Sequence, residues 1–455
     1  MKILLLMPQG PKYRRGAFFG KSLRYAPLTL STLAALVPDE LDAEITCLDE
    51  GTDTFDPRTC DYYDVVGITC ITGTSPRAYE FSQILRERGM YVVLGGVHPT
   101  LCPDEAMRNA DSIVTGYAEE TWPQLLQDVV EGKAQKRYEQ SKLYRFSSVP
   151  EPRRDLLNQK GYFTMNTVQA VRGCPYKCNF CVVPVAWPQY LHRPIPEVIA
   201  EIEKLKGNTF LFLDLSPIED KAYIKKLYRE LIPLKRYWGG LATMKITEDV
   251  ELRELASKSG CRGLLLGIES VNPNTLKQMR KGFNKPQEYA ERIKILHDLG
   301  IAVNGCFVLG LDDDDPDIFE RTVEFAMETA IDLPRYAVAT PFPGTPLYHE
   351  LNGENRILTQ DWSYYDGQTV VFNPKGMSAE QLHEGVRWAW KQTYSLPSIF
   401  KRVTQSTATR NWKVLMTSPA VNLGYRLYSA MLPKYMPIPC EAEPWLKSEQ
   451  PTFLK

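Results

Sequence analysis

The chain has 455 residues, of which 44% are hydrophobic and 24% are charged, and its formal net charge at pH 7 is −1. A chain of this length can bury the cores of two or three domains, and its composition is that of an ordinary globular protein. The charge balance excludes a strongly basic or acidic chain, and no window approaches the roughly 20 apolar residues of a membrane span.

The first residues, "MKILLLMPQG", resemble a secretion signal only in part. Their apolar run of about six residues is shorter than the roughly 7–15 residues of a signal peptide, and no small-residue cleavage site follows. We expect this run to be a buried first strand. Most of the ten cysteines lie in apolar runs, which is typical of reduced, buried thiols and predicts a cytoplasmic protein.

Residues 1–132 alternate between segments with the patterns of strands and helices. Five strands alternating with helices predict a doubly wound parallel sheet, which binds ligands beyond the carboxyl ends of its strands. The expected strands are "KILLLMP", "AEITCLDE", "DVVGITCITG", "YVVLGGVHPT" and "DSIVTGYAEE". The helices between them are expected in "LTLSTLAALVP", "SPRAYEFSQILRERG", "PDEAMRNA" and "TWPQLLQDVVEG".

Glycines and hydroxyl side chains follow three of these strands. Glycine lets a backbone approach a large ligand closely, and hydroxyls supply hydrogen bonds, although tight turns between strand and helix use the same residues. No G-x-G-x-x-G follows the first strand and the chain has no G-x-x-x-x-G-K-[ST], which argues against a nicotinamide or nucleoside triphosphate site. The candidate ligand residues are Thr72, Gly73, Thr74, Gly95, Gly96, His98, Gly116 and Glu119.

Three cysteines, Cys174, Cys178 and Cys181, lie within eight positions in "RGCPYKCNFC". Zinc normally takes four ligands, and neither a second C-x-x-C nor a nearby histidine pair completes such a site. A 4Fe–4S cubane has four irons, so three thiolates leave one iron open to a small chelating molecule. The triplet therefore favours an iron–sulfur cluster over structural zinc.

The spacing C-x-x-x-C-x-x-C, with the aromatic Phe180 before the last cysteine, resembles the signature of the radical S-adenosylmethionine (radical SAM) enzymes. The resemblance implies that the open iron binds the amino and carboxylate groups of SAM. One electron from the cluster then cleaves the sulfonium to give a 5′-deoxyadenosyl radical. The alternative, an electron-transfer iron–sulfur protein, needs a fourth thiol, and Cys261 and Cys306 lie in expected strands without a ligand-like context.

The chain beyond the triplet resembles the barrel of the same family. Strands roughly 25–40 residues apart with helices between them suit a partial (βα)6 TIM-type barrel. We expect the barrel at 161–352, after a doubly wound sheet domain at 1–135 and a linker at 136–160, and before a mainly helical region at 353–455. The segments that look like strands two to six are "NTFLFLDLSP", "YWGGLATM", "CRGLLLGIES", "IAVNGCFVLGLDDDD" and "YAVATPFPGTPLYHEL".

The barrel resemblance also implies residues for SAM. Glu269 and Ser270, in "GIES", match the fourth-strand motif that binds the ribose or methionine part. A barrel-end carboxylate held by a neighbouring lysine or arginine is the alternative for Glu269. Asn304 and Gly310 match the fifth-strand segment near the adenine, and Asp214 stands where the family contacts the SAM amino group.

A sheet domain with "GGVHPT" and "GYAEE" before the triplet resembles the cobalamin-binding subclass of radical SAM enzymes. This resemblance implies cobalamin beside the turns that contain Thr72, Gly95 and Gly116. The D-x-H-x-x-G motif that supplies a cobalt ligand in other cobalamin proteins is absent, so His98 is expected along the corrin edge and not on cobalt.

The C-terminal region is basic and aromatic. From Gly385 to Cys440 there are eight Lys or Arg and no Asp or Glu. Such a stretch can lie on an anionic membrane or hold a lipid-like substrate, and the alternative is a helical cap packed on the barrel. No RNA-binding signature accompanies it, so no nucleic-acid partner is expected. The interleaved aromatics are Trp388, Trp390, Tyr394, Phe400, Trp412, Tyr425, Tyr428 and Tyr435.

Together the resemblances imply a radical SAM methyltransferase with a 4Fe–4S cluster, SAM and cobalamin as cofactors. It would methylate an unactivated carbon of a small-molecule or lipid-like substrate, using a flavodoxin- or ferredoxin-type reductant. The alternative is a cyclase, rearrangement enzyme or oxidoreductase with the same cofactors and no methyl transfer. The expected location is the cytoplasm, with contact at the inner face of the membrane if the C-terminal region binds lipid.

Overall fold

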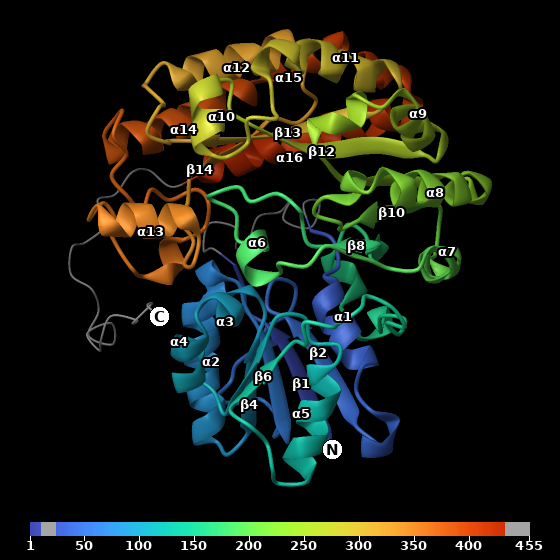
Figure 1. Ribbon diagram of the computed structural model, residues 1–455, viewed down its shortest axis with the longest axis vertical. Helices are drawn as coiled ribbons and strands as arrows, with labels where there is room; N and C mark the ends of the chain where they lie inside the picture. Colours follow the sequence, from blue (N-terminus) through green and yellow to red (C-terminus); the bar gives the residue numbers. More distant parts are fainter. Residues whose placement is uncertain (11–23, 433–455) are drawn as a thin grey trace.

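The structure, a computed structural model, describes residues 1–10 and 24–432 and contains two parallel sheets with helices around them (Figure 1). The first sheet lies in the N-terminal part and has six parallel strands in the order β2-β1-β3-β4-β5-β6. Its strands are β1 (Lys2–Met7), β2 (Glu44–Asp49), β3 (Val65–Thr69), β4 (Tyr91–Gly95), β5 (Ser112–Thr115) and β6 (Arg137–Glu139). Five of them are the expected strands.

Burial explains why the central strand has no alternation of polar and apolar residues. Ile3 to Leu6 are all fully buried, since β1 has helices on both faces of the sheet and a strand on either side. The helices of this domain are α1 (Leu28–Ala35), α2 (Ser75–Glu87), α3 (Val97–Leu101), α4 (Pro103–Arg108) and α5 (Thr121–Val130). The doubly wound parallel sheet predicted from the sequence is confirmed.

The second sheet is the open barrel, with six parallel strands in the order β14-β13-β12-β11-β10-β7. The strands are β7 (Thr167–Val168), β10 (Thr209–Phe212), β11 (Tyr237–Ala242), β12 (Cys261–Glu269), β13 (Ala302–Leu309) and β14 (Arg335–Val338). The helices around them are α7 (Ile195–Lys204), α8 (Lys221–Leu231), α9 (Val250–Lys258), α10 (Pro273–Gln278), α11 (Tyr289–Asp298) and α12 (Ile318–Glu328). This is the expected partial barrel of six strands.

Alternation along β13 separates the two sides of the barrel wall. Val303, Phe307 and Leu309 are fully buried beneath the helices, whereas Asn304 and Cys306 between them are half-buried. Phe307 stacks on Tyr336 of β14 at 5.7 Å, and Phe325 of α12 contacts the same ring. Side chains of the second set therefore face the lumen, where a ligand can reach them.

The C-terminal helices cover the outer face of the last barrel strand. Trp390 donates a 3.0 Å hydrogen bond to the Tyr336 carbonyl, and Tyr394 donates one of 2.7 Å to the Pro334 carbonyl. Tyr425 and Tyr428 pack on Trp390, so these four aromatic residues are core residues, as the helical-cap alternative predicts. Tyr435 lies outside the described residues. The covering helices are α14 (Ala379–Thr393), α15 (Leu396–Gln405) and α16 (Trp412–Met431), whereas α13 (Pro346–Gly353), which follows β14 in the chain, lies apart from them (Figure 1).

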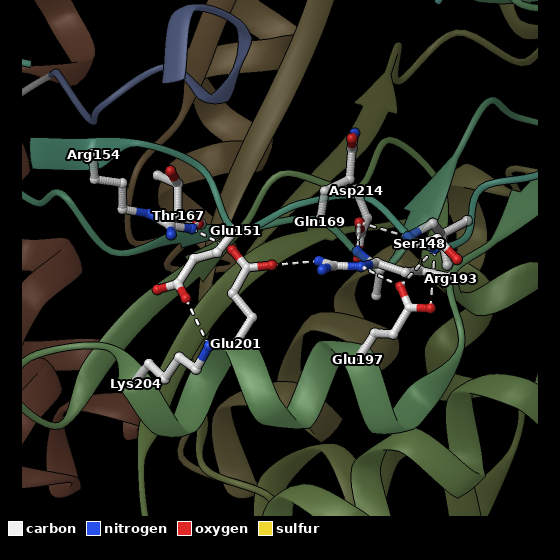
Figure 2. A network of polar contacts seen from close by, with 12 residues as sticks. Ser148, Glu151, Arg154, Thr167, Gln169, Arg193, Glu197, Glu201, Lys204 and Asp214 are labelled. Atoms are coloured by element: carbon white, nitrogen blue, oxygen red, sulfur yellow. Dashed lines mark hydrogen bonds and ion pairs between the residues drawn. The ribbon is translucent and has the colours of Figure 1, made fainter. Parts of the chain in front are cut away.

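The linker is held on the barrel by a buried charge cluster. The Glu201 carboxylate of α7 accepts from Arg154 of the linker and from Arg193, and Figure 2 shows it between the two guanidinium groups. One turn earlier on α7, Glu197 accepts from the Ser148 backbone N–H at 3.1 Å. These contacts fix the linker against the start of the barrel.

The carboxyl end of the first sheet faces the barrel. Helix α3, which follows β4, packs on the short helix α6 (Val183–Ala186) just after the cysteine triplet, and Figure 1 shows α6 between the two parts of the molecule. The edge where a doubly wound sheet binds ligands therefore lies against the loop that carries the thiols. Within the described residues, no helix is long and apolar enough to span a membrane.

Candidate functional site

The cysteine triplet lies in a loop closed by a short antiparallel hairpin, β8 (Val171–Arg172) and β9 (Leu191–His192). All three thiols are free; Cys178 is buried, and Cys174 and Cys181 are half-buried. Burial raises the pKa of Cys178 to about 12, the nearby Lys281 ammonium opposes this, and the neighbouring thiols add to it. The three sulfurs are therefore close enough to interact electrostatically.

This arrangement fits a cluster better than a single metal ion. Among the described residues, the one group of three ligand atoms within 4.8 Å of one another is His98, Cys102 and Glu105, which excludes the triplet. Three free thiols spread along one loop can each bind a different iron of a 4Fe–4S cubane, which leaves the fourth iron to another ligand. Phe180, the predicted aromatic neighbour, packs half-buried against the barrel core.

Glu269 ends β12 beside the triplet. It has a left-handed backbone, with φ of 68°, and its carboxylate forms an ion pair with Lys281. Burial acts to lower the pKa of Lys281, but the charge of Glu269 outweighs it and raises that pKa. The alternative in which a lysine holds this carboxylate is therefore present in the structure, and contact between Glu269 and SAM stays a prediction.

Hydrogen bonds from the loops that follow β12 fix Ser270 and the end of this strand. Ser270 is fully buried, and its hydroxyl accepts a 3.0 Å hydrogen bond from the Asn272 backbone. Asn284 donates to the carbonyls of Gly267 at 2.9 Å and Ile268 at 3.1 Å. The strained turn at the end of β12 is thus held by neighbouring loops, which pre-organises it for a ligand.

The carboxylate of Asp214, after β10, accepts hydrogen bonds from the protein's own backbone. Its Oδ1 accepts from the backbone N–H groups of Ala170 at 2.8 Å and Val171 at 2.9 Å, and the residue is 1% exposed. Burial raises its pKa to about 7, and the two backbone hydrogen bonds oppose this. The carboxylate positions the strand that leads into the cysteine loop, as Figure 2 shows, and its contact with the SAM amino group stays a prediction.

Asn304 and Gly310, the two residues predicted to lie near the adenine, differ: one has an atom free to bind a ligand, and the other is explained by its position in the fold. The Oδ1 atom of Asn304 is buried without a hydrogen-bond partner among the described residues, which fits a donor from a cofactor. Gly310 has φ of 96°, and a Cβ atom there would collide with Leu382 of α14. The left-handed backbone and the close contact with Leu382 therefore explain glycine at position 310 without a ligand.

On the sheet-domain side, His98 is fully buried. Its Nδ1 lies 3.4 Å from Thr72 Oγ1, and its Nε2 lies 3.3 Å from Glu105, which also accepts from the Trp362 indole N–H at 3.1 Å. Burial acts to raise the pKa of Glu105, but its hydrogen bond and charge interaction with His98 outweigh it and lower that pKa. His98 thus anchors the segment after the barrel to the sheet domain.

The turns after β3 and β4 are tightly packed, with one open side. Thr74 hydrogen-bonds the Ile71 backbone at 3.2 Å, and Gly73 lies against the Tyr365 carbonyl. Gly96 has φ of 99°, with the Cys70 carbonyl 2.8 Å from the position of a Cβ. Gly95 has no atom within 3.6 Å of that position, and Ile71 is 56% exposed. An exposed apolar side chain at this edge suits the flat face of a corrin.

The turn Gly116–Glu119 joins the two domains directly. Glu119 pairs with Arg172 at 2.5 Å, two residues before Cys174, and the guanidinium lies over the ring of Tyr117 at 4.4 Å. The Tyr117 ring stacks on Trp187 at 5.5 Å and 7°. The other Glu119 oxygen and the Trp187 indole N–H are buried without partners in the described residues. A contact in the sheet domain therefore positions the cysteine loop.

The sequence interpretation missed Arg172, Trp187, Lys281 and Trp362. Arg172 and Trp187 flank the triplet, and their closeness to it in the sequence could have identified them as site residues. Lys281 lies in a loop 12 residues after Glu269, and Trp362 lies 257 residues after Glu105. No periodic pattern connects such residues, so only the fold brings them together.

Two family models match the chain: the Radical SAM superfamily at residues 168–326 and the B12 binding domain at residues 23–126. The bacteriochlorophyllide d C-12(1)-methyltransferase of Chlorobaculum tepidum is 33% identical over 399 residues, covering 85% of this chain and 87% of that protein. The bacteriochlorophyllide d C-8(2)-methyltransferase of the same organism is 30% identical, covering 68% and 73%.

Among solved structures, the cobalamin-dependent S-adenosylmethionine radical enzyme OxsB with aqua-cobalamin bound has a TM-score of 0.68 at 13% identity, covering 94% of this chain and 72% of that one. This likeness confirms the fold, with the sheet domain before the barrel. The 4Fe–4S cluster, SAM and cobalamin are accordingly the cofactors of this enzyme; the cluster and SAM supply a carbon-centred radical, and cobalamin carries the methyl group. The chain belongs to the cobalamin-dependent radical SAM methyltransferases.

Proposed function

We propose that this enzyme methylates an unactivated carbon at the periphery of a carboxylated tetrapyrrole of the bacteriochlorophyllide type. The substrate class is supported by two relatives, at 33% and 30% identity, that are both named for bacteriochlorophyllide d. A tetrapyrrole is also a small molecule with a large apolar face, which agrees with the lipid-like substrate expected from the sequence.

The observation that carries the reaction type is the meeting of the two ligand-binding edges at the cysteine loop. The Arg172–Glu119 ion pair and the packing of α3 on α6 bring the carboxyl end of the sheet domain to the triplet. A substrate carbon held at this junction can meet a radical formed on the barrel side and a methyl group carried on the sheet side. An inert carbon needs both, because nucleophilic methyl transfer cannot replace its hydrogen.

The site residues keep distinct roles in this proposal. Cys174, Cys178 and Cys181 hold the cluster, and Phe180 packs beside it. Glu269, Ser270 and Asn304 face SAM, while Asp214 and Gly310 shape the ends of their strands. Cobalamin lies against the turns of the sheet domain, and the contacting residues are Thr72, Gly73, Thr74, Gly95, Gly96, His98, Gly116 and Glu119.

The proposal also includes the boundaries and the partners. We place the sheet domain at 1–135, extended by strand β6 (Arg137–Glu139) from the predicted linker at 136–160, the barrel at 161–352 and the helical region at 353–455. The electron donor is a flavodoxin- or ferredoxin-type protein, because the cluster must be reduced before SAM is cleaved. We place the enzyme in the cytoplasm, with peripheral contact at the inner face of the membrane.

The test is an anaerobic assay of the protein reconstituted with iron, sulfide and hydroxocobalamin. The reduced enzyme receives bacteriochlorophyllide d and SAM with a deuterated methyl group, and products are identified by mass spectrometry. We expect a product with one trideuteromethyl group, together with 5′-deoxyadenosine and S-adenosylhomocysteine. Cys178→Ala should abolish the methylated product and 5′-deoxyadenosine, since both need the cluster, and Cys60→Ala, a thiol remote from the triplet, should abolish neither.

The other outcomes are equally informative. Deoxyadenosine with an altered but unmethylated macrocycle would support the cyclase or rearrangement alternative. Deoxyadenosine with an unchanged macrocycle would contradict the substrate class, and no deoxyadenosine from a fully loaded cluster would contradict the proposed reaction.

A further inference from the structure

One face of α16 turns apolar side chains to solvent. They recur every three or four positions over a helix about 30 Å long, and none of them is charged. Trp412 is 64% exposed and Leu423 is 44% exposed. The face, which we call the α16 stripe, consists of Trp412, Leu415, Pro419, Ala420, Leu423, Leu427, Ala430 and Met431.

Two polar residues of this helix, Ser418 and Asn422, point into the protein. Asn422 is fully buried and donates to the Asp332 carbonyl at 3.2 Å, and Ser418 is also buried. Arg402 of α15, itself fully buried, donates to Asn422 Oδ1 at 3.0 Å. A helix on the surface of a soluble domain normally buries apolar residues and exposes charged ones. On α16 apolar residues lie on both sides, since Val414, Tyr425 and Tyr428 are buried while the α16 stripe is exposed. The exposed stripe therefore suits an apolar partner.

The charge of the surrounding sequence restricts that partner. Residues 385–440 contain eight Lys or Arg and no Asp or Glu. Lys391 and Lys401 are exposed, and Phe400, beside Lys401 on the adjacent α15, is 72% exposed. A partner with an apolar interior and an anionic surface satisfies both properties. A second copy of this chain would bring the same basic residues together across a two-fold axis.

We propose that the α16 stripe docks on an anionic lipid bilayer, with the helix axis parallel to the membrane plane. Apolar side chains would enter the boundary between headgroups and acyl chains by about 5–10 Å, and exposed lysines would meet lipid phosphates. No spanning segment is needed, because the rest of the helix remains packed on the barrel through Asn422, Tyr425 and Tyr428.

The experiment is vesicle flotation of the reconstituted full-length protein, without substrate or SAM. Vesicles contain phosphatidylcholine alone or mixed with phosphatidylglycerol. We expect flotation with the anionic vesicles, less with the neutral ones, and a decrease as salt rises. Leu423→Gln with Leu427→Gln should lower vesicle binding about tenfold or more, since two apolar side chains lose their burial. The matched control, Leu143→Gln with Val130→Gln, changes two exposed apolar residues elsewhere and should bind like the unaltered protein.

Absence of flotation with anionic vesicles would overturn the proposal, as would flotation that the α16 substitutions leave unchanged. A dimer in sedimentation velocity that the same substitutions dissociate, without vesicle binding, would assign the stripe to self-association instead. If the first pair fails to fold, Leu415→Gln with Met431→Gln tests the two ends of the same stripe. The assay needs no turnover, so its failure is distinct from failure of the methylation assay.

Discussion

The Glu201 carboxylate, between Arg154 and Arg193, gives the clearest prediction for a single residue. Its side chain is 3% exposed, and those of the two arginines are 13% and 7% exposed. Glu201→Ala should lower the free energy of unfolding by about 3–5 kcal/mol, because the Arg154 guanidinium loses its counter-charge and Arg193 keeps only its 3.4 Å pair with Glu197. Urea unfolding of the protein without cofactors measures the loss. Glu203→Ala, on the exposed side of α7, should change stability little, and equal effects of the two variants would contradict a role for the buried cluster.

Asp214 gives a prediction about how the stability of the protein depends on pH. Burial raises its folded-state pKa to about 7, well above the ordinary carboxyl value of about 4. The folded protein therefore keeps this proton in a range where the unfolded chain has released it. The stabilisation is fully present below about pH 4 and is lost as the pH rises to 7. We therefore expect the unfolding free energy of the unaltered protein minus that of Asp214→Asn to fall as the pH rises from about 4 to 7.

Thermal melts of both proteins across that range measure the effect. Asn cannot titrate, so the variant supplies the baseline for all other ionisable groups. A difference that stays constant with pH would show that Asp214 is ionised throughout in the folded protein.

At the level of single residues, the sequence predicted the thiols and the strand-end residues but not their partners. The triplet is a local pattern, so its spacing was sufficient. The Glu269–Lys281 pair needs a loop to fold back onto a strand, and the Glu105–Trp362 contact needs the segment after the barrel to reach the first domain. Such pairings depend on tertiary structure, which local patterns do not encode.

At the scale of elements, the contact between the Gly116–Glu119 turn and the β8 strand is the charged link between the two domains at the site, beside the packing of α3 on α6. Arg172→Met leaves the Glu119 carboxylate buried without a counter-charge, which should cost about 3–5 kcal/mol of stability. We expect a lower melting temperature and less iron bound after reconstitution, because the cysteine loop loses its anchor. Arg172→Lys keeps the charge but not the planar stacking, and should be intermediate. Normal iron content in Arg172→Met would show that the loop needs no such anchor.

Elements with a strong pattern were predicted from the sequence, and short polar ones were not. Strand β6 has three residues, Arg137–Glu139, of which only Tyr138 is buried, so it was assigned to the linker. It adds a sixth strand because it pairs with β5. The first barrel strand, β7, has two residues, and the β8–β9 hairpin pairs two residues with two. Segments this short form because longer neighbours hold them, not through their own propensity.

At the scale of the whole molecule, the two cofactor regions have separate cores. Buried side chains of the sheet domain pack on both faces of its sheet, apart from the barrel core. Cys178→Ala should therefore lose the cluster and the cleavage of SAM, yet bind cobalamin with nearly unchanged affinity. Iron analysis and the absorbance of bound cobalamin measure the two properties in one sample. Loss of cobalamin together with iron would show that the domains load as a single unit.

The order of the domains could be predicted from the sequence, but the side to which the C-terminal aromatic side chains turn could not. Repeated strand and helix patterns predicted the sheet domain, and the family resemblance of the cysteine triplet and the later segments implied the barrel after it. The basic, aromatic composition of the last third left two alternatives, since composition does not say which side of a helix faces inward. Trp390, Tyr394, Tyr425 and Tyr428 turn inward, toward β14 and one another. Trp412, three leucines and Met431 remain on the outside of α16.

The covering of β14 by α14 also has a consequence for how the chain is synthesised. The sheet domain is built from a continuous N-terminal stretch that can fold as soon as it leaves the ribosome. The outer face of β14, including Tyr336, is covered only by residues such as Trp390 and Thr393, more than fifty positions later. While the ribosome adds those residues, the nascent barrel presents an uncovered aromatic wall. We therefore expect the final stage of translation to be the interval in which this protein depends most on chaperones.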